Sequence, residues 1–549
     1  MMRRVLESAR DFFPLIVVGA ALAWASVSIW QHRVHENPPG TIVIRIGHWQ
    51  LEAGVREAIE AVARDYEKLH PNVRIVQDAI PDQVFAQWIN TQLVGGTAPD
   101  LVEAGGLMAP PLWLNLQRRY LVPLTRYYAR PNPYNAGTDL EGVPLTQTLK
   151  GGNAVVPELQ ENMEISLSRV SVRLFYNRDL LRRVTGLETP PSDLGGFVEM
   201  CRKIQAAGVI PVVGSSYHFG MWNQLFDAVT YPAWRRGDFN RDGYVGSDET
   251  FAAFQLGHLD MNFPAYRAKF DLIGELSPYF QPGFAGLTRE EGVLLFAQQR
   301  AVFMSTGLWE ALGLMELAKG KFEIGVMKFP EPTANDERFG RYLEGPIYED
   351  PRIVFGFGVT KTSRHPEVAI DFLLFMASQR ENERLNRIIG WIPNTVGADP
   401  DPTLAAFEPN LRGVYPAQDF TISGDTTIRW KQLFDLFSVG QISYDDLAKD
   451  FGAFFRERGA VGLRLQHESW QRGLVQREQL RAGLLGRSLA ADGATATLLR
   501  DRFVSLLPVH EVIDHAFLID LAAGRLPSPS TSDKHSPAVR DAVRRALQP

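Results

Sequence analysis

The stretch IVIRIGHWQ, residues 42–50, begins the pattern that decides the fold of this chain. Its first five residues are apolar apart from Arg45 and rich in β-branched side chains, which predicts a buried strand. The following segments alternate in type: a helical stripe at 55–69 stopped by Pro71, a strand at 73–76, a helical stripe at 84–93, and a strand from Leu101. This alternation predicts a parallel α/β sheet with right-handed crossovers.

The topology of such a sheet also predicts where a ligand would bind. Ligands of open α/β sheets bind beyond the carboxyl ends of the parallel strands. In this chain, the loop at 48–50 follows the first strand and the loop at 103–107 follows the third. We therefore expect both loops to face a cleft.

Composition places the chain among large globular proteins. Of its 549 residues, 45% are hydrophobic and 22% are charged, values that argue against a disordered chain and a polytopic membrane protein. Its formal net charge is −6, and without a basic excess we expect no nucleic-acid partner. The single cysteine, Cys201, permits neither an intramolecular disulfide nor a cysteine-rich zinc site.

The N-terminus departs from this composition. Residues 12–30 carry no charge and as a helix would span about 28 Å, close to the thickness of the bilayer core. Three arginines among the first ten residues precede this run, a bias that keeps the N-terminus cytoplasmic and exports the rest of the chain. We predict a membrane anchor at 12–30 and an extracytoplasmic body. A cleaved signal peptide is the alternative, because Ala23-Trp24-Ala25 fits a cleavage site.

Eight short segments then occur in an order typical of one protein family. They are Tyr66 to Ile75, Gly96 to Val102, Leu174 to Leu181, Pro190 to Ser192, Phe296 to Met304 with Gly307 to Trp309, Ile324 to Val326 with Phe329-Pro330, His365 to Leu373, and Gly390 to Pro393. In this order they resemble family 1 of the extracellular solute-binding proteins of ABC importers, the maltose-binding-protein-like group. The resemblance covers residues 41 to about 455.

This resemblance implies an α/β, two-lobed periplasmic-binding-protein fold of type II, in which two lobes close on a ligand about a hinge. Residues 1–40 would form the signal anchor and linker. Lobe 1 would comprise 41–150 with 355–400, and lobe 2 would comprise 151–354 with 400–457. Residues 458–549 exceed the family pattern. Their leucine stripes predict a helical extension that either packs on lobe 2 or contacts a partner.

The family pattern also implies which residues contact the ligand. A sugar has flat apolar faces and a rim of hydroxyls, so its site needs aromatic platforms and polar groups. The matching positions are Trp49, Gln50, Glu103, Tyr176, Trp222, Trp309 and Trp391. Trp309 follows a Gly-x-Trp turn that implies a stacking platform, with core packing as the alternative. His218 lies close to Trp222 in sequence and could line the same lobe.

A separate motif occupies residues 238–249, DFNRDGYVGSDE, and matches the calcium-loop pattern D-x-[DN]-x-[DN]-G-x5-E throughout. Carboxylate, amide and backbone oxygens are the ligands that calcium prefers, and a glycine at the sixth position makes the sharp turn. The predicted ligands are Asp238, Asn240, Asp242, Tyr244 through its backbone carbonyl, and Glu249. Sensor loops occur in pairs, so a single loop favours a structural calcium ion. A polar turn without metal is the alternative.

These patterns together predict an extracytoplasmic protein that captures a small solute, in particular a saccharide, for an ABC permease. The alternative is a membrane-tethered sensor or scaffold that uses the same fold. We do not expect an enzyme. Nucleophile-elbow and P-loop motifs are missing from the sequence, and His510-Glu511 is followed by a histidine at His515, one position too far for a helical zinc motif.

Overall fold

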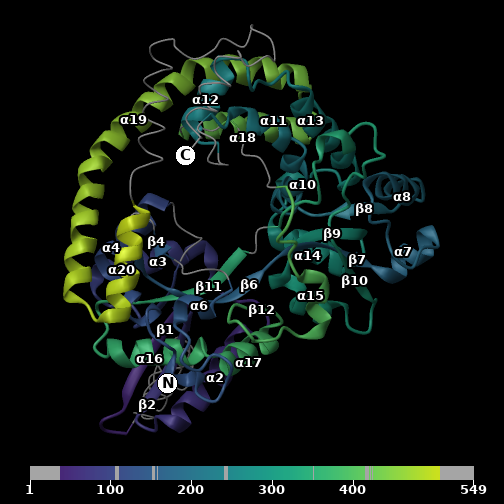
Figure 1. Cartoon of the computed structure of the whole chain (residues 1–549). Coiled ribbons are helices and arrows are strands. Elements are labelled where there is room, and N and C mark those ends of the chain that lie inside the picture. The colour runs from purple at the N-terminus through teal and green to yellow at the C-terminus, as the bar shows by residue number, and fades with distance from the viewer. Residues whose placement is uncertain are drawn as a thin grey trace, which may run out of the picture.

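The computed structural model describes residues 38–104, 110–150, 155–156, 159–239, 245–349, 352–414, 420, 422 and 424–506. The predicted N-terminal anchor, residues 12–30, lies outside this part of the chain. Within the described part, every helix is too short or too polar to span a bilayer. Two α/β lobes and one long helix surround a central opening (Figure 1).

Lobe 1 is built on a six-stranded sheet with the strand order β12-β6-β11-β3-β1-β2. Its strands are β1 (Ile42–His48), β2 (Val73–Ala79), β3 (Leu101–Ala104), β6 (Ile165–Val170), β11 (Arg352–Val359) and β12 (Ile392–Pro393). β1 pairs in parallel with β2 and β3, while β11 is antiparallel to β3 and β6. The predicted alternation over 42–102 is confirmed, with α2 (Val55–Leu69) and α3 (Asp82–Gly95) as the crossover helices.

Lobe 2 is built on a four-stranded sheet with the order β10-β7-β9-β8. Its strands are β7 (Val172–Asn177), β8 (Ile210–Val213), β9 (Ala301–Gly307) and β10 (Ile324–Met327). β8 pairs in parallel with β9, whereas β7 is antiparallel to β9 and β10. Alternate β7 residues enter different cores: Leu174 packs in the core of lobe 2, and Phe175 joins a core that is continuous with lobe 1. The two lobes therefore share buried apolar contacts.

The chain first crosses between the lobes at Ser171, later than the boundary at residue 150 that we expected from the sequence. β6 pairs with β11 and β12, so residues 165–170 complete the sheet of lobe 1. β7 begins only two residues after β6 ends and joins the other sheet. Both strands are buried along their whole length. Because a run of this kind looks the same in either sheet, the sequence does not reveal the division at Ser171.

Three crossing segments meet at one buried arginine. Arg173 is 1% exposed and its guanidinium nitrogens lie 3.0 and 3.1 Å from the carboxylate oxygens of Glu349. It also donates to the carbonyls of Ala406 and Glu408 at 2.5 and 2.8 Å. Residues 171–173, 349 and 406–408 belong to different passages between the lobes, so this fork connects all three. This cluster holds together three connections between the lobes, and we refer to it as the hinge.

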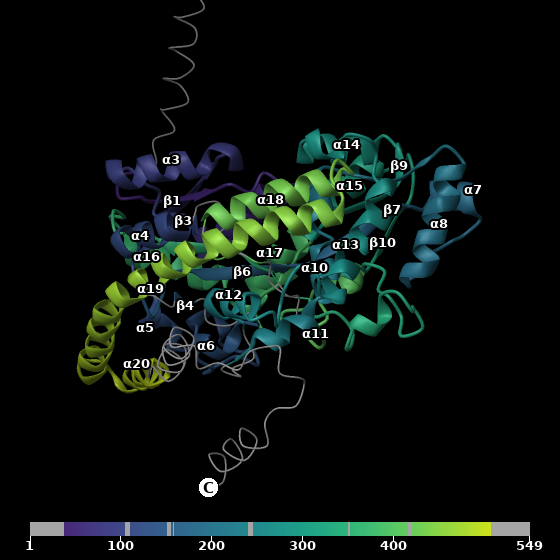
Figure 2. The ribbon, with the colours of Figure 1, turned by 90° about the horizontal axis from the view of Figure 1, so that it is seen from above.

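The helical extension that we expected from residue 458, packed on lobe 2 or on a partner, is continuous with a helix that begins in lobe 2, and it reaches lobe 1. α18 (Gly424–Ser438) is followed by α19 (Tyr444–Ala490), a single helix of 47 residues and thus about 70 Å long. It passes through residue 458 without a break. α20 (Gly493–Ser505) then turns back and packs against the end of α19. Figures 1 and 2 show α19 running from α12 (Ser247–Gln255) and α18 in lobe 2 to the side of lobe 1 near α4 (Pro110–Tyr120).

Candidate functional site between the lobes

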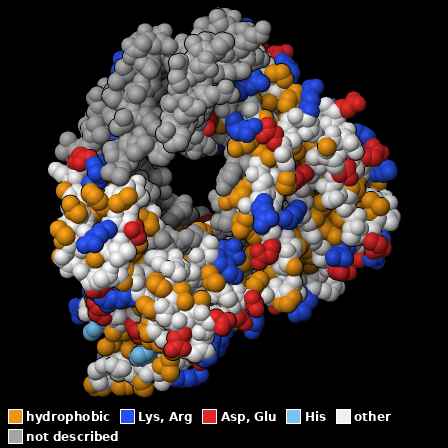
Figure 3. Space-filling view, viewed as in Figure 1, with side chains coloured by type: hydrophobic (Ala, Val, Ile, Leu, Met, Phe, Trp, Pro, Cys, Tyr) orange, Lys and Arg blue, Asp and Glu red, His pale blue; other side chains and the backbone are white. Residues whose placement is uncertain are grey.

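The carboxyl ends of the parallel strands of both sheets lead into loops that meet at the junction of the lobes. In lobe 1, residues 49–54 follow β1; in lobe 2, residues 214–217 follow β8 and residues 308–310 follow β9. Ligands bind beyond such strand ends. The molecule is hollowed between the lobes on the face seen in Figure 3. This junction is therefore the candidate site.

Arg289, in the first turn of α14 (Arg289–Ala297), contacts all three loops. Its Nη2 lies 3.3 Å from Oε1 of Glu52 in lobe 1, and its Nε donates to Oε1 of Glu310 in lobe 2 at 2.6 Å. Its guanidinium carbon lies 5.5 Å from the centroid of the Tyr217 ring. Burial lowers the pKa of Arg289, but the attraction of Glu310, Tyr217 and Glu52 outweighs it and raises the pKa. Arg289 thus stays charged and bridges the lobes.

Three predicted ligand residues come together on the lobe 1 side. Glu103, near the end of β3, is 1% exposed. Its Oε1 accepts a hydrogen bond from Nε2 of Gln50 at 2.6 Å, and its Oε2 accepts one from the backbone N–H of Trp49 at 3.1 Å. Burial raises the pKa of Glu103 well above its usual range. The Trp49 ring packs edge-on against Phe85, with 5.1 Å between centroids. The site therefore includes a positioned carboxyl group beside a half-buried tryptophan.

A second carboxyl group, Glu164, was not predicted from the sequence. It directly precedes β6, and a Cβ placed on Gly356 of β11 would lie 3.0 Å from its carboxyl carbon. Oε2 of Glu164 is buried, and none of the described residues donates a hydrogen bond to it. Burial raises the pKa of Glu164 to about 7. The pKa of Glu103 is raised mainly by burial, and the charge of Glu164 also raises it. The two carboxyl groups therefore belong to one polar cluster.

Trp309 lies where the cores of the two lobes meet, because its half-buried side chain packs against both. Its ring folds over Gly307, where an added Cβ would lie 2.2 Å from the ring atoms. The glycine of the Gly-x-Trp turn is therefore required for this ring position. The indole Nε1 is buried, and the described residues provide no acceptor for its proton. Trp309 accordingly combines an aromatic face with an unused donor at the junction.

The structure does not bring the other predicted aromatic residues to the junction. Trp222 is 1% exposed within the core of lobe 2 and donates from Nε1 to Oγ of Ser305 at 3.1 Å. Trp391 is 2% exposed and packs 5.7 Å from the Phe355 ring. Both are core residues, which is the more common role of an aromatic side chain at such a position.

Tyr176 and His218 are also buried. Tyr176 pairs with Gly325 on β10, where an added Cβ would lie 2.1 Å from the tyrosine ring, and it stands four residues beyond the junction end of β7. His218 is fully buried, with Nδ1 2.9 Å from Oγ of Ser215. Burial lowers the pKa of His218 to about 4, so this imidazole is neutral at physiological pH.

The predicted calcium loop is only partly described. Asn240, Asp242 and Tyr244 lie outside the described residues, whereas Asp238 and Glu249 lie within them. Glu249 is 2% exposed, and its two carboxylate oxygens each accept a hydrogen bond at 3.0 Å, from the backbone N–H groups of Phe239 and Gly246. This carboxylate therefore connects the two ends of the loop.

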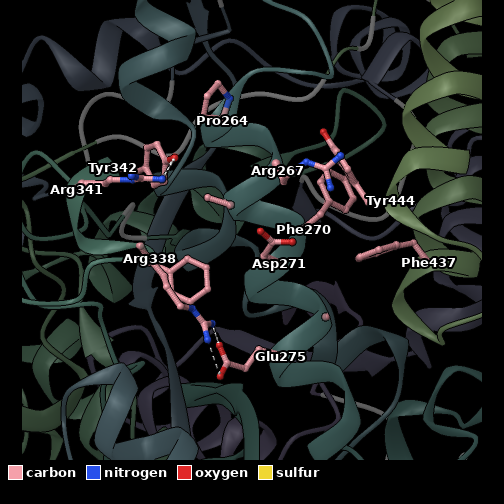
Figure 4. Close-up of a pocket in the computed structure, with 13 residues that line it drawn as sticks. Pro264, Arg267, Phe270, Asp271, Glu275, Arg338, Arg341, Tyr342, Phe437 and Tyr444 are labelled. Carbon is pink, nitrogen blue, oxygen red and sulfur yellow. Dashed lines mark hydrogen bonds and ion pairs between the residues drawn. The ribbon is translucent and has the colours of Figure 1, made fainter.

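A groove of about 800 Å³ lies elsewhere on lobe 2, between α13 (Pro264–Leu276), residues 338–342 and the start of α19 (Figure 4). Arg338 forms an ion pair with Glu275, and Arg267 forms one with Asp445. Arg341 donates to the Tyr342 hydroxyl at 2.8 Å. The arginines of this groove therefore have partners on its own walls, and the groove shares no residue with the junction site.

Comparisons with known proteins agree with this architecture. A family model described as bacterial extracellular solute-binding protein matches residues 50–383. An uncharacterized ABC transporter extracellular-binding protein of Pyrococcus horikoshii is 20% identical over 364 residues, which cover 65% of this chain and 73% of that protein. Two solved structures, a chitin oligosaccharide binding protein and RafE in complex with raffinose, are each 16% identical to this chain. Their TM-scores are 0.53 and 0.54, and each match covers 76% of this chain and 99% of the neighbour.

Proposed function

Because this chain belongs to the family of bacterial extracellular solute-binding proteins, we propose that it captures a saccharide at the junction of its lobes and delivers it to an ABC permease. The family match confirms two expectations from the sequence: a solute-binding protein, and a protein that is not an enzyme. The saccharide class and the permease are the proposal. The name of the Pyrococcus relative and the ligands named for the two solved structures support it.

The observation that carries the saccharide proposal is the pair of carboxyl groups, Glu103 and Glu164, on the lobe 1 side of the junction, together with Trp309, which packs against the cores of both lobes. Burial raises the pKa of Glu103 and of Glu164, so both groups tend to hold a proton and to present uncharged hydrogen-bonding atoms. An uncharged solute with many hydroxyls suits such groups better than a cation does, because a cation would need ionised carboxylates. The Trp309 ring and its free N–H supply a stacking face and a donor.

This proposal is tested by calorimetry and thermal melting of the full chain with neutral oligosaccharides, amino acids and polyamines. We expect an oligosaccharide to raise the melting temperature, and Trp309→Ala to weaken its binding by about 2 kcal/mol, typical of a stacked aromatic contact. Leu317→Ala is the matched control, because Leu317 is 44% exposed on the helix that follows Trp309. Binding of a polyamine and of no saccharide would refute the proposed ligand class.

Two further features of the proposal concern the cell envelope and calcium. The family is extracellular, and we propose that residues 12–30 tether the body to the outer side of the cytoplasmic membrane.

We also propose that residues 238–249 hold a structural calcium ion, supported by the position of Glu249 across the loop. A chelator should then lower the melting temperature of the full chain and leave the Glu249→Gln variant unchanged. Equal effects on both proteins would contradict the calcium proposal.

A further inference from the structure

The first half of α19 is part of lobe 2. Four aromatic and aliphatic side chains along one face of this half are buried in the core of lobe 2; they are Tyr444, Leu447, Phe451 and Phe455. The Tyr444 hydroxyl donates to the carbonyl of Met261. Gly459, a turn further along, lies so close to α12 that an added Cβ would be 2.6 Å from the Phe251 ring. This end of the helix is therefore firmly fixed to lobe 2.

The other end of the same helical unit is attached to lobe 1 through Arg502 of α20. Arg502 is 6% exposed. Its Nη1 donates to the carbonyl of Gln160 at 2.7 Å and to Oγ1 of Thr125 at 3.1 Å, and its Nη2 donates to Oδ1 of Asn162 at 2.5 Å. All three acceptors belong to lobe 1, in α5 (Thr125–Tyr128) or beside and within β5 (Glu161–Asn162). A buried guanidinium without these acceptors would be strongly unfavourable.

Two ion pairs and an apolar contact surround Arg502. Arg487, near the end of α19, pairs with Glu161, and Asp492, at the N-terminus of α20, pairs with Arg130. Leu484 of α19 and Leu499 of α20 are buried. The contact with lobe 1 therefore consists of a buried arginine with three acceptors and of two ion pairs at defined positions.

We propose that α19 and α20 form a strut that sets the separation of the two lobes. A two-lobed protein with connections only at the hinge can open and close by rotation about it. Here a third connection, an unbroken helix about 70 Å long, joins the lobes on the side of the opening away from the hinge (Figure 1). Rotation about the hinge must then bend the helix or detach α20. The two lobes can therefore adopt only a narrow range of separations.

Part of this chain lies outside its match with each of the two solved structures. The two solved structures are covered to 99% by their matches, but these matches include only 76% of this chain. About a quarter of the chain thus has no counterpart in either neighbour. The proposal concerns the molecule without solute, so it holds or fails independently of the saccharide proposal.

The strut is tested by double electron–electron resonance on the full chain without solute. Spin labels are placed at Val94→Cys on α3 and Leu294→Cys on α14, which are 66% and 53% exposed and lie on different lobes. Cys201, the one native cysteine, is buried and leaves the labels specific. We expect a narrow distance distribution in the otherwise native chain.

Two variants test separately the contact of α20 with lobe 1 and the continuity of α19. Arg502→Gln removes the guanidinium hydrogen bonds to lobe 1 but leaves the two flanking ion pairs. Leu465→Pro interrupts α19 at an exposed residue, between its two attachments. Each should broaden the distribution about twofold, because the lobes regain rotation about the hinge. Arg500→Gln is the matched control, an exposed arginine on the same helix as Arg502, and should leave it unchanged. If Arg502→Gln does not fold, Leu465→Pro decides alone. An unchanged narrow distribution in folded Leu465→Pro would overturn the strut.

Discussion

At the scale of single residues, the junction combines groups whose charges depend on burial. Glu103 and Glu164 both have raised pKa values because they are buried, whereas Arg289 stays charged through its contacts with Glu310 and Glu52. The lobe 1 side therefore presents carboxyl groups that tend to be neutral. The lobe 2 side presents the positive charge of Arg289, which Glu310 and Glu52 compensate. This arrangement makes the site polar without a strong net field.

Glu164 should make the stability of the protein depend on pH. Its pKa rises from an ordinary 4.5 to about 7 in the folded chain, so between these values the folded state keeps a proton that the unfolded chain releases. Stability contributed by this group is complete below pH 4.5 and decreases as the pH rises through 7. Glu164→Gln should remove this loss. At pH 8 it should stabilise the protein by up to about 3 kcal/mol, and at pH 4 it should have little effect.

Denaturant unfolding of both proteins at several pH values measures the difference. Glu290→Gln is the control, since Glu290 is an exposed acid on α14. A constant difference between Glu164→Gln and the native chain from pH 4 to 8 would show that folding does not raise the pKa of Glu164.

Part of this site could be predicted from residues alone. Trp49, Gln50 and Glu103 come together because the carboxyl ends of β1 and β3 are neighbours in a parallel sheet. Glu164 precedes an antiparallel strand, and Arg289 starts a helix that follows an irregular segment. Neither position carries a local pattern, because their proximity to Glu103 and Glu52 arises only from the tertiary fold. An aromatic residue type was likewise insufficient to predict a ligand contact. Trp222 is a core residue whose N–H donates to Ser305.

At the scale of elements, glycines within α19 show why its length was not foreseen. Gly459 lies just past residue 457, the expected end of lobe 2. In the structure this glycine allows α19 and α12 to approach, and its missing side chain leaves room for Phe251. The same residue type that predicts a helix end therefore marks a close contact between helices. The alternation of strands and helices over 42–102 was easier to predict, because strands and helices differ in the period of their hydrophobic residues.

A pair of glycine variants on this one helix should have opposite effects. Gly459→Ala places a methyl group 2.6 Å from the Phe251 ring and should destabilise the protein by about 1–3 kcal/mol through overpacking. Gly483→Ala meets nothing within 4 Å and should stabilise it by up to about 1 kcal/mol, the difference in helix propensity. Thermal and denaturant unfolding measure both variants. If Gly459→Ala stabilised the protein as Gly483→Ala does, the close contact between α19 and α12 would be incorrect.

At the scale of the whole molecule, three connections hold the lobes. The hinge joins three crossing segments at Arg173, the Arg289–Glu52 pair bridges the junction, and the strut joins the opposite sides. The last two restrict the same rotation, so their effects should not add. When the strut is intact, loss of the Arg289–Glu52 pair should hardly change the separation of the lobes. With the strut interrupted, the same loss should let the lobes move apart.

This dependence predicts the outcome of a double-mutant cycle. Glu52→Gln removes the lobe 1 partner of Arg289 but leaves its bond to Glu310, so lobe 2 keeps its local structure. In the otherwise native chain, Glu52→Gln should leave the distance between labels at Val94→Cys and Leu294→Cys nearly unchanged. In the Leu465→Pro background, it should increase the open population about two- to fivefold, the effect of losing an ion pair worth about 0.5–1 kcal/mol. Glu57→Gln, an exposed acid on α2, should change neither background. Equal effects of Glu52→Gln in both backgrounds would mean that the strut and the junction pair act on different motions.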